Sequence, residues 1–184
     1  MIIQTIILIL MLICCFITDL TKQKIYNWVT LPGIGLGFLI NGIFSGMVGL
    51  KSAGLGFSIG FSFLFIIFLV GGMGGGDVKL MGAIGALKGY PFVISALVYS
   101  ILVGGFIAFA VLIWKKKFLR TMRNIFLFLI SKVFPFIHSS EMKKEEMEKV
   151  PFGIAIVIGT IWALIMEFIS SKPLIFDIFN IFKL

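Results

Sequence analysis

The sequence predicts an all-α membrane protein, a polytopic bundle of about six transmembrane helices with one amphipathic helix at the membrane surface. Three observations carry this prediction. Of 184 residues, 60% are hydrophobic and 13% are charged, whereas soluble domains usually carry about 25% charged residues. The mean hydropathy is +1.16. The charged residues also separate long uncharged windows, and each window approaches or exceeds the ~20 residues that cross a ~30 Å hydrocarbon core.

The uncharged windows define the expected crossings in order. They cover residues 1–18, 25–50, 52–76, 89–114 and 150–166. A shorter, separate helix is expected from Val78 to Leu87, and it leads into the next span through Lys88 and Pro91. Glycines recur at four-residue spacing in the second and third windows, which favours close helix contact in a membrane. These pairs are Gly33/Gly37, Gly42/Gly46 and Gly56/Gly60.

The segment 115–149 interrupts this pattern with nine Lys and Arg residues. From Phe118 to Val133 apolar residues recur at helical spacing on one face, while Arg120 and Arg123 lie on the other. This pattern is typical of a helix lying in the headgroup region, and a seventh crossing over 118–137 is the alternative. We therefore expect one membrane-embedded domain over 1–184, with 115–149 as a cytoplasmic or interfacial insertion before the last span.

The cations also predict the orientation. Because Lys and Arg concentrate in cytoplasmic loops, Lys22, Lys24 and the 115–149 segment are expected on the cytoplasmic side of the inner membrane. The net charge of +8 has this topological explanation, so no nucleic-acid partner is expected. With alternating crossings, Asp19 and Asp77 then both lie at cytoplasmic helix ends.

Asp19 and Asp77 are the candidate chemical groups in a chain with few polar residues. Two carboxyls that share one proton can activate a water and protonate a carbonyl. Helix dipoles favour Asp77 as the anion and Asp19 as the proton carrier. The simpler alternatives are a helix N-cap for Asp77 and an interfacial flanking residue for Asp19. A stable membrane helix does not favour the five glycines in residues 71–76, which predicts unwound backbone lining a cavity before Asp77.

These residues resemble a known family. The stretch Gly74-Gly75-Gly76-Asp77-Val78-Lys79-Leu80 is similar to the GxGD signature of type IV prepilin peptidases, which are membrane aspartyl proteases. Two further elements resemble the family's first aspartate motif and a third recurrent motif. They are Asp19-Leu20 with Ile25, Asn27 and Thr30, and Pro151-Phe152-Gly153 at the start of the last span. The resemblance covers residues 10 to 165, in the family's order and spacing.

The resemblance implies a catalytic dyad of Asp19 and Asp77 at the cytoplasmic membrane face. This dyad would remove a short basic leader from prepilin-like substrates, just before their hydrophobic N-terminal helix. The resemblance also implies an active-site loop of Gly74, Gly75, Gly76 and Lys79. Structural or substrate-positioning roles are implied for Asn27, Pro151, Phe152 and Gly153. No metal or cofactor is implied. The partners are prepilin-like proteins and membrane lipids, and the oligomeric state is left open.

Two departures from the family pattern bear on the activity. Tyr26 stands where the family commonly has Pro. The paired Cys-x-x-Cys insert of larger members is absent, so N-methyltransferase activity is not expected, and the chain more resembles short peptidase-only members such as those of Flp/Tad pili. Lys79 is a candidate ion-pair partner of Asp77. Three alternative functions stay open: a small transporter, a metal-dependent lipid phosphotransferase and a non-catalytic secretion scaffold.

Overall fold

The computed structural model describes residues 2–22, 24–69, 73–114 and 152–170. The chain divides into two units, one of Met1–Gly104 with Pro151–Leu184 and one of Gly105–Val150. The candidate site described below lies entirely in the first unit. The segment 115–149, with its expected amphipathic helix or seventh crossing, lies outside the described residues.

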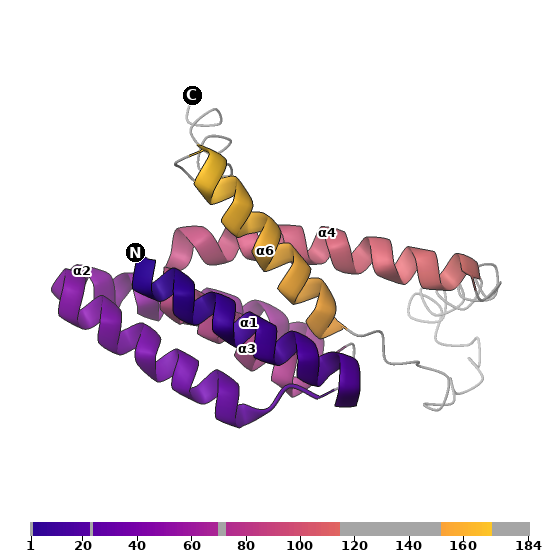
Figure 1. Ribbon diagram of the computed structural model, residues 1–184, viewed down its shortest axis with the longest axis horizontal. Helices are drawn as coiled ribbons and strands as arrows, with labels where there is room; N and C mark the ends of the chain where they lie inside the picture. The colour runs from indigo at the N-terminus through magenta and orange to yellow at the C-terminus, as the bar shows by residue number, and fades with distance from the viewer. Residues whose placement is uncertain (1, 23, 70–72, 115–151, 171–184) are drawn as a thin grey trace, which may run out of the picture. The chain divides into compact units, whose positions relative to one another are not determined.

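Every element among the described residues is a helix, which confirms the predicted all-α class (Figure 1). The helices are α1 (Ile2–Lys22), α2 (Asn27–Leu69), α3 (Gly75–Lys88), α4 (Tyr90–Trp114) and α6 (Phe152–Ser170). Four of them, α1, α2, α4 and α6, are long and apolar enough to cross a membrane. Many of their large apolar side chains are exposed, for example Met47 and Val48 on α2, as expected where lipid replaces water.

The six expected crossings are not confirmed as six separate spans. Two predicted windows join in the 43-residue α2, which bends at Gly46. The backbone there has φ +55°, a conformation that glycine adopts at little cost. The turn at Gly46 comes five residues before the break expected near Lys51. The backbone conformation of this glycine, rather than the charge of Lys51, determines where the helix breaks. Helix α3 has 14 residues, or about 21 Å at 1.5 Å per residue, which is less than the hydrocarbon thickness.

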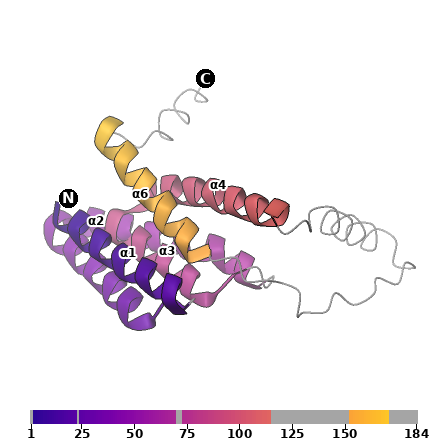
Figure 2. The ribbon, with the colours of Figure 1, turned by 45° about the vertical axis from the view of Figure 1, so that its right-hand side comes forward.

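The two limbs of α2 fold back on each other. The rings of Phe38 and Phe57 lie 6.1 Å apart, although about 28 Å of straight helix would separate their positions. Both views show the limbs running alongside α3 (Figures 1 and 2). Asn41 on the first limb donates to the backbone carbonyls of Ala86 and Leu87 at 3.0 and 3.2 Å, which satisfies acceptors that the end of α3 leaves free.

Helix α3 is the most enclosed element, with almost all residues from Val78 to Leu87 buried. The backbones of Gly56 on α2 and Gly85 on α3 meet so closely that a Cβ on either would collide with the other. Three of the glycines from the four-residue pattern, Gly37, Gly56 and Gly60, lie against α3, so they serve helix packing as expected. The core is completed by α1, the first half of α4 and α6.

Candidate functional site

Asp19 occupies the last turn of α1 and is 6% exposed. The backbone N–H of Ile154, in the first turn of α6, hydrogen-bonds its carboxyl group. Its Oδ2 atom is buried and has no hydrogen-bond partner among the described residues. It faces the Cα of Gly153, where a Cβ would come within 2.5 Å of it. The first turn of α6 therefore forms one wall of the site and leaves one carboxyl oxygen of Asp19 available.

Asp77 lies in the first turn of α3 and is 9% exposed. Gly74 is the N-cap residue, in extended conformation, and its N–H donates to Asp77 Oδ2 at 3.2 Å. The backbone N–H of Asp77 in turn donates to the Gly74 carbonyl at 3.1 Å. The simpler interpretation of Asp77 as the N-cap itself is wrong in position, because Asp77 is the third helical residue and its carboxyl reaches back to the capping residue.

The glycine strip is only partly unwound. Gly74 lies outside the helix, but Gly75 and Gly76 are helical, as is Lys79, so the expected active-site loop is mostly the first turn of α3. The helix can begin at Gly75 because the Asp77 carboxyl accepts a hydrogen bond from the backbone N–H of Gly74. This N–H would otherwise lack a partner at the start of the helix. Gly71 and Gly72 lie outside the described residues.

Ile25 joins the two aspartate-bearing turns. Its Cβ lies 2.9 Å from where a Cβ on Gly76 would stand, and its Cδ1 lies 3.1 Å from the same position on Gly153. The link between α1 and α2 thus packs against both α3 and α6 beside the carboxyls. The absence of side chains at Gly76 and Gly153 permits this approach.

The electrostatics of the site couple the two acids. Burial raises the pKa of Asp77, which lies outside the four candidate spans, from 3.8 to about 6. The Gly74 N–H lowers this pKa, and the negative charge of Asp19 raises it. The expected assignment of Asp77 as the anion considered its helix dipole alone. Burial and a nearby like charge oppose that dipole. Burial also disfavours negative charge on Asp19, whereas the N-terminus of α6 favours it.

The remaining predicted residues lie around this centre. Lys79 does not pair with Asp77 among the described residues, because its Nζ instead donates to Asn27 Oδ1 at 2.9 Å and links the start of α2 to α3. Phe152 packs against Gly104 of α4. Pro151 lies outside the described residues. Within those residues, no three His, Cys, Asp or Glu side chains gather as metal ligands would.

Sequence reasoning missed the backbone N–H of Ile154 as a site group. A signal was present, since the first amides of any helix lack intrahelical partners and Pro151-Phe152-Gly153 was expected to open the last span. Which acid those amides face depends on how α6 packs against α1, and no local pattern contains that information. Two buried carboxyls near one another are the kind of groups that acid–base hydrolysis uses.

Comparison with known proteins places the chain in a family. Residues 6–109 match the type IV leader peptidase family, a stretch that includes both aspartates. The chain belongs to this family. It is 35% identical over 99 residues to the prepilin leader peptidase/N-methyltransferase of Bacillus subtilis (strain 168). The matched stretch covers 51% of this chain and 38% of that relative. No solved structure matches the chain.

Proposed function

We propose that this protein is a membrane aspartyl endopeptidase that removes the short basic leader of type IV prepilin-like substrates, including pseudopilins or Flp-type pilins. Membership of the leader peptidase family supports the reaction class, and a relative named a prepilin leader peptidase supports the substrate class. The proposal covers the peptidase reaction alone and not N-methylation, since the chain contains no Cys-x-x-Cys pair.

The observation that carries the mechanism is the pair of buried carboxyls at adjoining helix ends. In the proposed reaction, ionised Asp19 takes a proton from a water molecule whose oxygen attacks the scissile carbonyl carbon. Protonated Asp77 donates to the carbonyl oxygen as the tetrahedral intermediate forms. When the carbon–nitrogen bond breaks, the proton held by Asp19 passes to the leaving amine. A hydroxyl proton of the intermediate returns to Asp77 as the carbonyl re-forms, which restores both acids. The negative charge of Asp19 raises the pKa of Asp77, which supports one shared proton, and the hydrogen bond from the Ile154 N–H supports Asp19 as the ionised member.

Charge at the same end of the bundle supports a cytoplasmic active site in the inner membrane. Lys22 ends α1 one turn after Asp19, and Lys24 follows in the link to α2. The positive-inside rule places such cations on the cytoplasmic side. A transporter that coordinates ions through these aspartates would need them near the middle of the membrane, whereas Asp19 occupies the last turn of its helix.

The test is leader cleavage of a co-expressed candidate prepilin in membranes. We expect Asp19→Asn and Asp77→Asn each to lower the cleavage rate by about 10²–10⁴-fold, because an amide can neither take up nor deliver the proton. Asp177→Asn is the matched control, since it makes the same chemical change at the remaining aspartate of the sequence. Immunoblots of the membrane fraction would confirm equal insertion. Wild-type cleavage by either dyad variant would refute the proposed dyad.

A further inference from the structure

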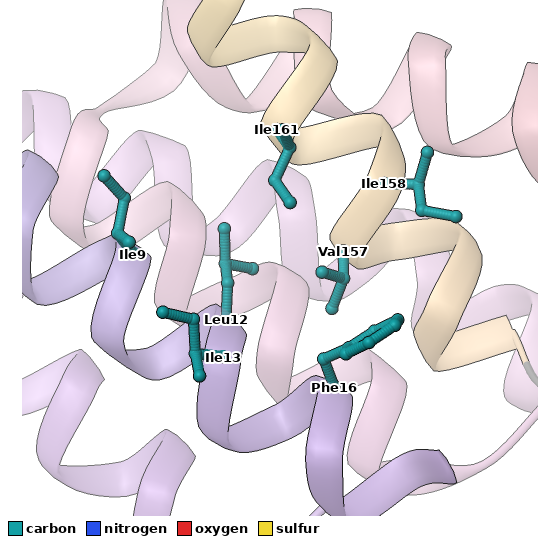
Figure 3. Close-up of a pocket in the computed structure, with 7 residues that line it drawn as sticks. All are labelled: Ile9, Leu12, Ile13, Phe16, Val157, Ile158 and Ile161. Atoms are coloured by element: carbon teal, nitrogen blue, oxygen red, sulfur yellow. The ribbon is translucent and has the colours of Figure 1, made fainter.

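An apolar groove of about 260 Å³ runs between α1 and α6 (Figure 3). Leu12 and Val157 are buried at its base, whereas the isoleucines along its sides are about half exposed. The described residues that line it are all apolar. The lining residues are Ile9, Leu12, Ile13, Phe16, Val157, Ile158 and Ile161. Both helices are candidate membrane spans, so the groove faces the lipid phase.

The groove is continuous with the candidate site. Phe16 lies one helical turn before Asp19 on α1, and Val157 lies one turn after Gly153 on α6. These two side chains lie close together at one end of the groove (Figure 3), and Asp19 contacts Gly153 just beyond them. The same pair of helices therefore builds the carboxyl site at its end and an apolar channel leading away from it into the membrane.

We propose that this groove binds the first two turns of the apolar helix that follows the cleaved bond of the substrate. The inference rests on the proposed function, because it requires a substrate whose scissile bond directly precedes an apolar segment. From Ile9 to Phe16 the groove extends about 10 Å along α1, which is two turns of a helix. Because the groove ends beside Asp19, a helix bound in it would have its end at that carboxyl.

The shape of the groove favours a helix over a lipid chain as its occupant. Between membrane helices, close packing rather than release of water drives association. Five of the seven lining residues are isoleucine or valine, whose stiff β-branched side chains hold a fixed surface. A fixed surface can select side chains that recur at positions i and i+4, whereas a disordered acyl chain gains little from it. The absence of lining charges excludes the basic leader itself.

The first experiment fills the groove. Ile13→Trp and Ile161→Trp each place a bulky ring in it, and Leu10→Trp is the matched control, because Leu10 is 59% exposed beside Ile13 at 51% but does not line the groove. Each variant is tested on an intact substrate and on a soluble peptide that ends shortly after the scissile bond. We expect the two groove variants to lower kcat/KM for the intact substrate by about tenfold and to cleave the peptide as wild type does.

The outcomes separate this inference from the proposed function. Equal loss on both substrates, or no loss on the intact one, overturns groove binding while leaving the peptidase activity established. If wild type cleaves neither substrate, the proposed function fails and this inference fails with it. Loss in Leu10→Trp equal to that in Ile13→Trp also overturns groove binding, because the effect would then be general to α1.

Photo-crosslinking gives a readout independent of catalysis. A photoreactive phenylalanine derivative is placed at position 13, 161 or 10 in the Asp77→Asn variant, in membranes that contain the intact substrate. We expect adducts with the substrate's apolar segment from positions 13 and 161 and few from position 10. Adducts with lipid alone from positions 13 and 161 would show that acyl chains fill the groove, and would overturn the proposal.

Discussion

Gly74 controls the protonation of Asp77 through a single backbone hydrogen bond. Burial raises the pKa of Asp77 to about 6, and the Gly74 N–H opposes that rise. In the proposed mechanism Asp77 acts while protonated, so cleavage falls as the pH rises through about 6. Gly74 has φ −82° and ψ 146°, values that proline also adopts, so the hydrogen bond can be removed without changing the backbone path.

Gly74→Pro should therefore move the alkaline limb of the pH–rate profile to higher pH. The Gly74 N–H stabilises the ionised carboxylate, so its loss raises the pKa of Asp77. We expect the alkaline limb to move by about one pH unit. Gly74→Ala is the control, because it adds a Cβ but keeps the N–H. Cleavage rates measured from pH 5 to 9 in both variants provide the comparison, and coinciding alkaline limbs would contradict the assignment.

Gly153 leaves room for the Asp19 carboxyl. In Gly153→Ala a Cβ would stand 2.5 Å from Oδ2 and 2.9 Å from Cγ, so the carboxyl must move away from the Ile154 N–H. We expect kcat to fall by about 10²-fold, as misplacement of a catalytic group by about 1 Å does, with KM little changed. Gly75→Ala is the control near the site, since among the described residues its Cβ would meet only the Phe68 ring, at 3.6 Å. Equal kinetics in the two variants would argue against this role.

At the scale of elements, the α2 hairpin and α3 are held together by backbone contact. The carbonyl of Gly56 stands where a Cβ on Gly85 would be, and small residues at such contacts let membrane helices pack closely. Because α3 carries Asp77 at its start, the depth of this contact also sets where that carboxyl lies. The helix packing inside the bundle therefore also determines the geometry of the candidate site at its end.

Gly85→Ala should destabilise the protein by about 1–3 kcal/mol, since both contacting atoms are backbone and cannot move aside cheaply. Gly35→Ala, on the same hairpin, meets nothing within 4 Å and should be neutral or slightly stabilising, because Ala is the better helix former. Thermal unfolding in detergent, followed by circular dichroism, compares the two. A lower midpoint for Gly35→Ala than for Gly85→Ala would contradict the packing argument.

On the scale of the whole molecule, a second set of contacts holds the helices of the first unit together at the end of α3 opposite the candidate site. The Lys88 side chain, 5% exposed, pairs with Glu167 of α6 at 2.7 Å and donates to Thr5 of α1 at 3.3 Å. It also lies over the Phe92 ring of α4. One cation therefore joins α1, α3, α4 and α6, and three of these helices also meet at the carboxyl site.

Lys88→Met should lower the free energy of unfolding by about 2 kcal/mol, because removing one partner of a partly buried ion pair leaves the other unpaired. The double variant Lys88→Met with Glu167→Gln should recover part of that loss, because the unpaired charge is gone. Unfolding midpoints in detergent for the single and double variants measure this coupling. A double variant less stable than Lys88→Met alone would show that the pair does not carry the effect.

The sequence by itself determined the membrane class, the approximate bounds of the helices, and the choice of Asp19 and Asp77 as candidates. These features are local, because apolar windows and the few charged residues can be identified from contiguous stretches of sequence. Only the tertiary structure decided the turn at Gly46, the burial of α3, the approach of the Ile154 amide to Asp19 and the groove beside it. These depend on which remote helices pack together, since residues 19, 77 and 153 share a site only when α1, α3 and α6 meet. The catalytic roles of the two aspartates stay predictions, because the positions of two carboxyls permit the proposed reaction but only a cleavage assay tests it.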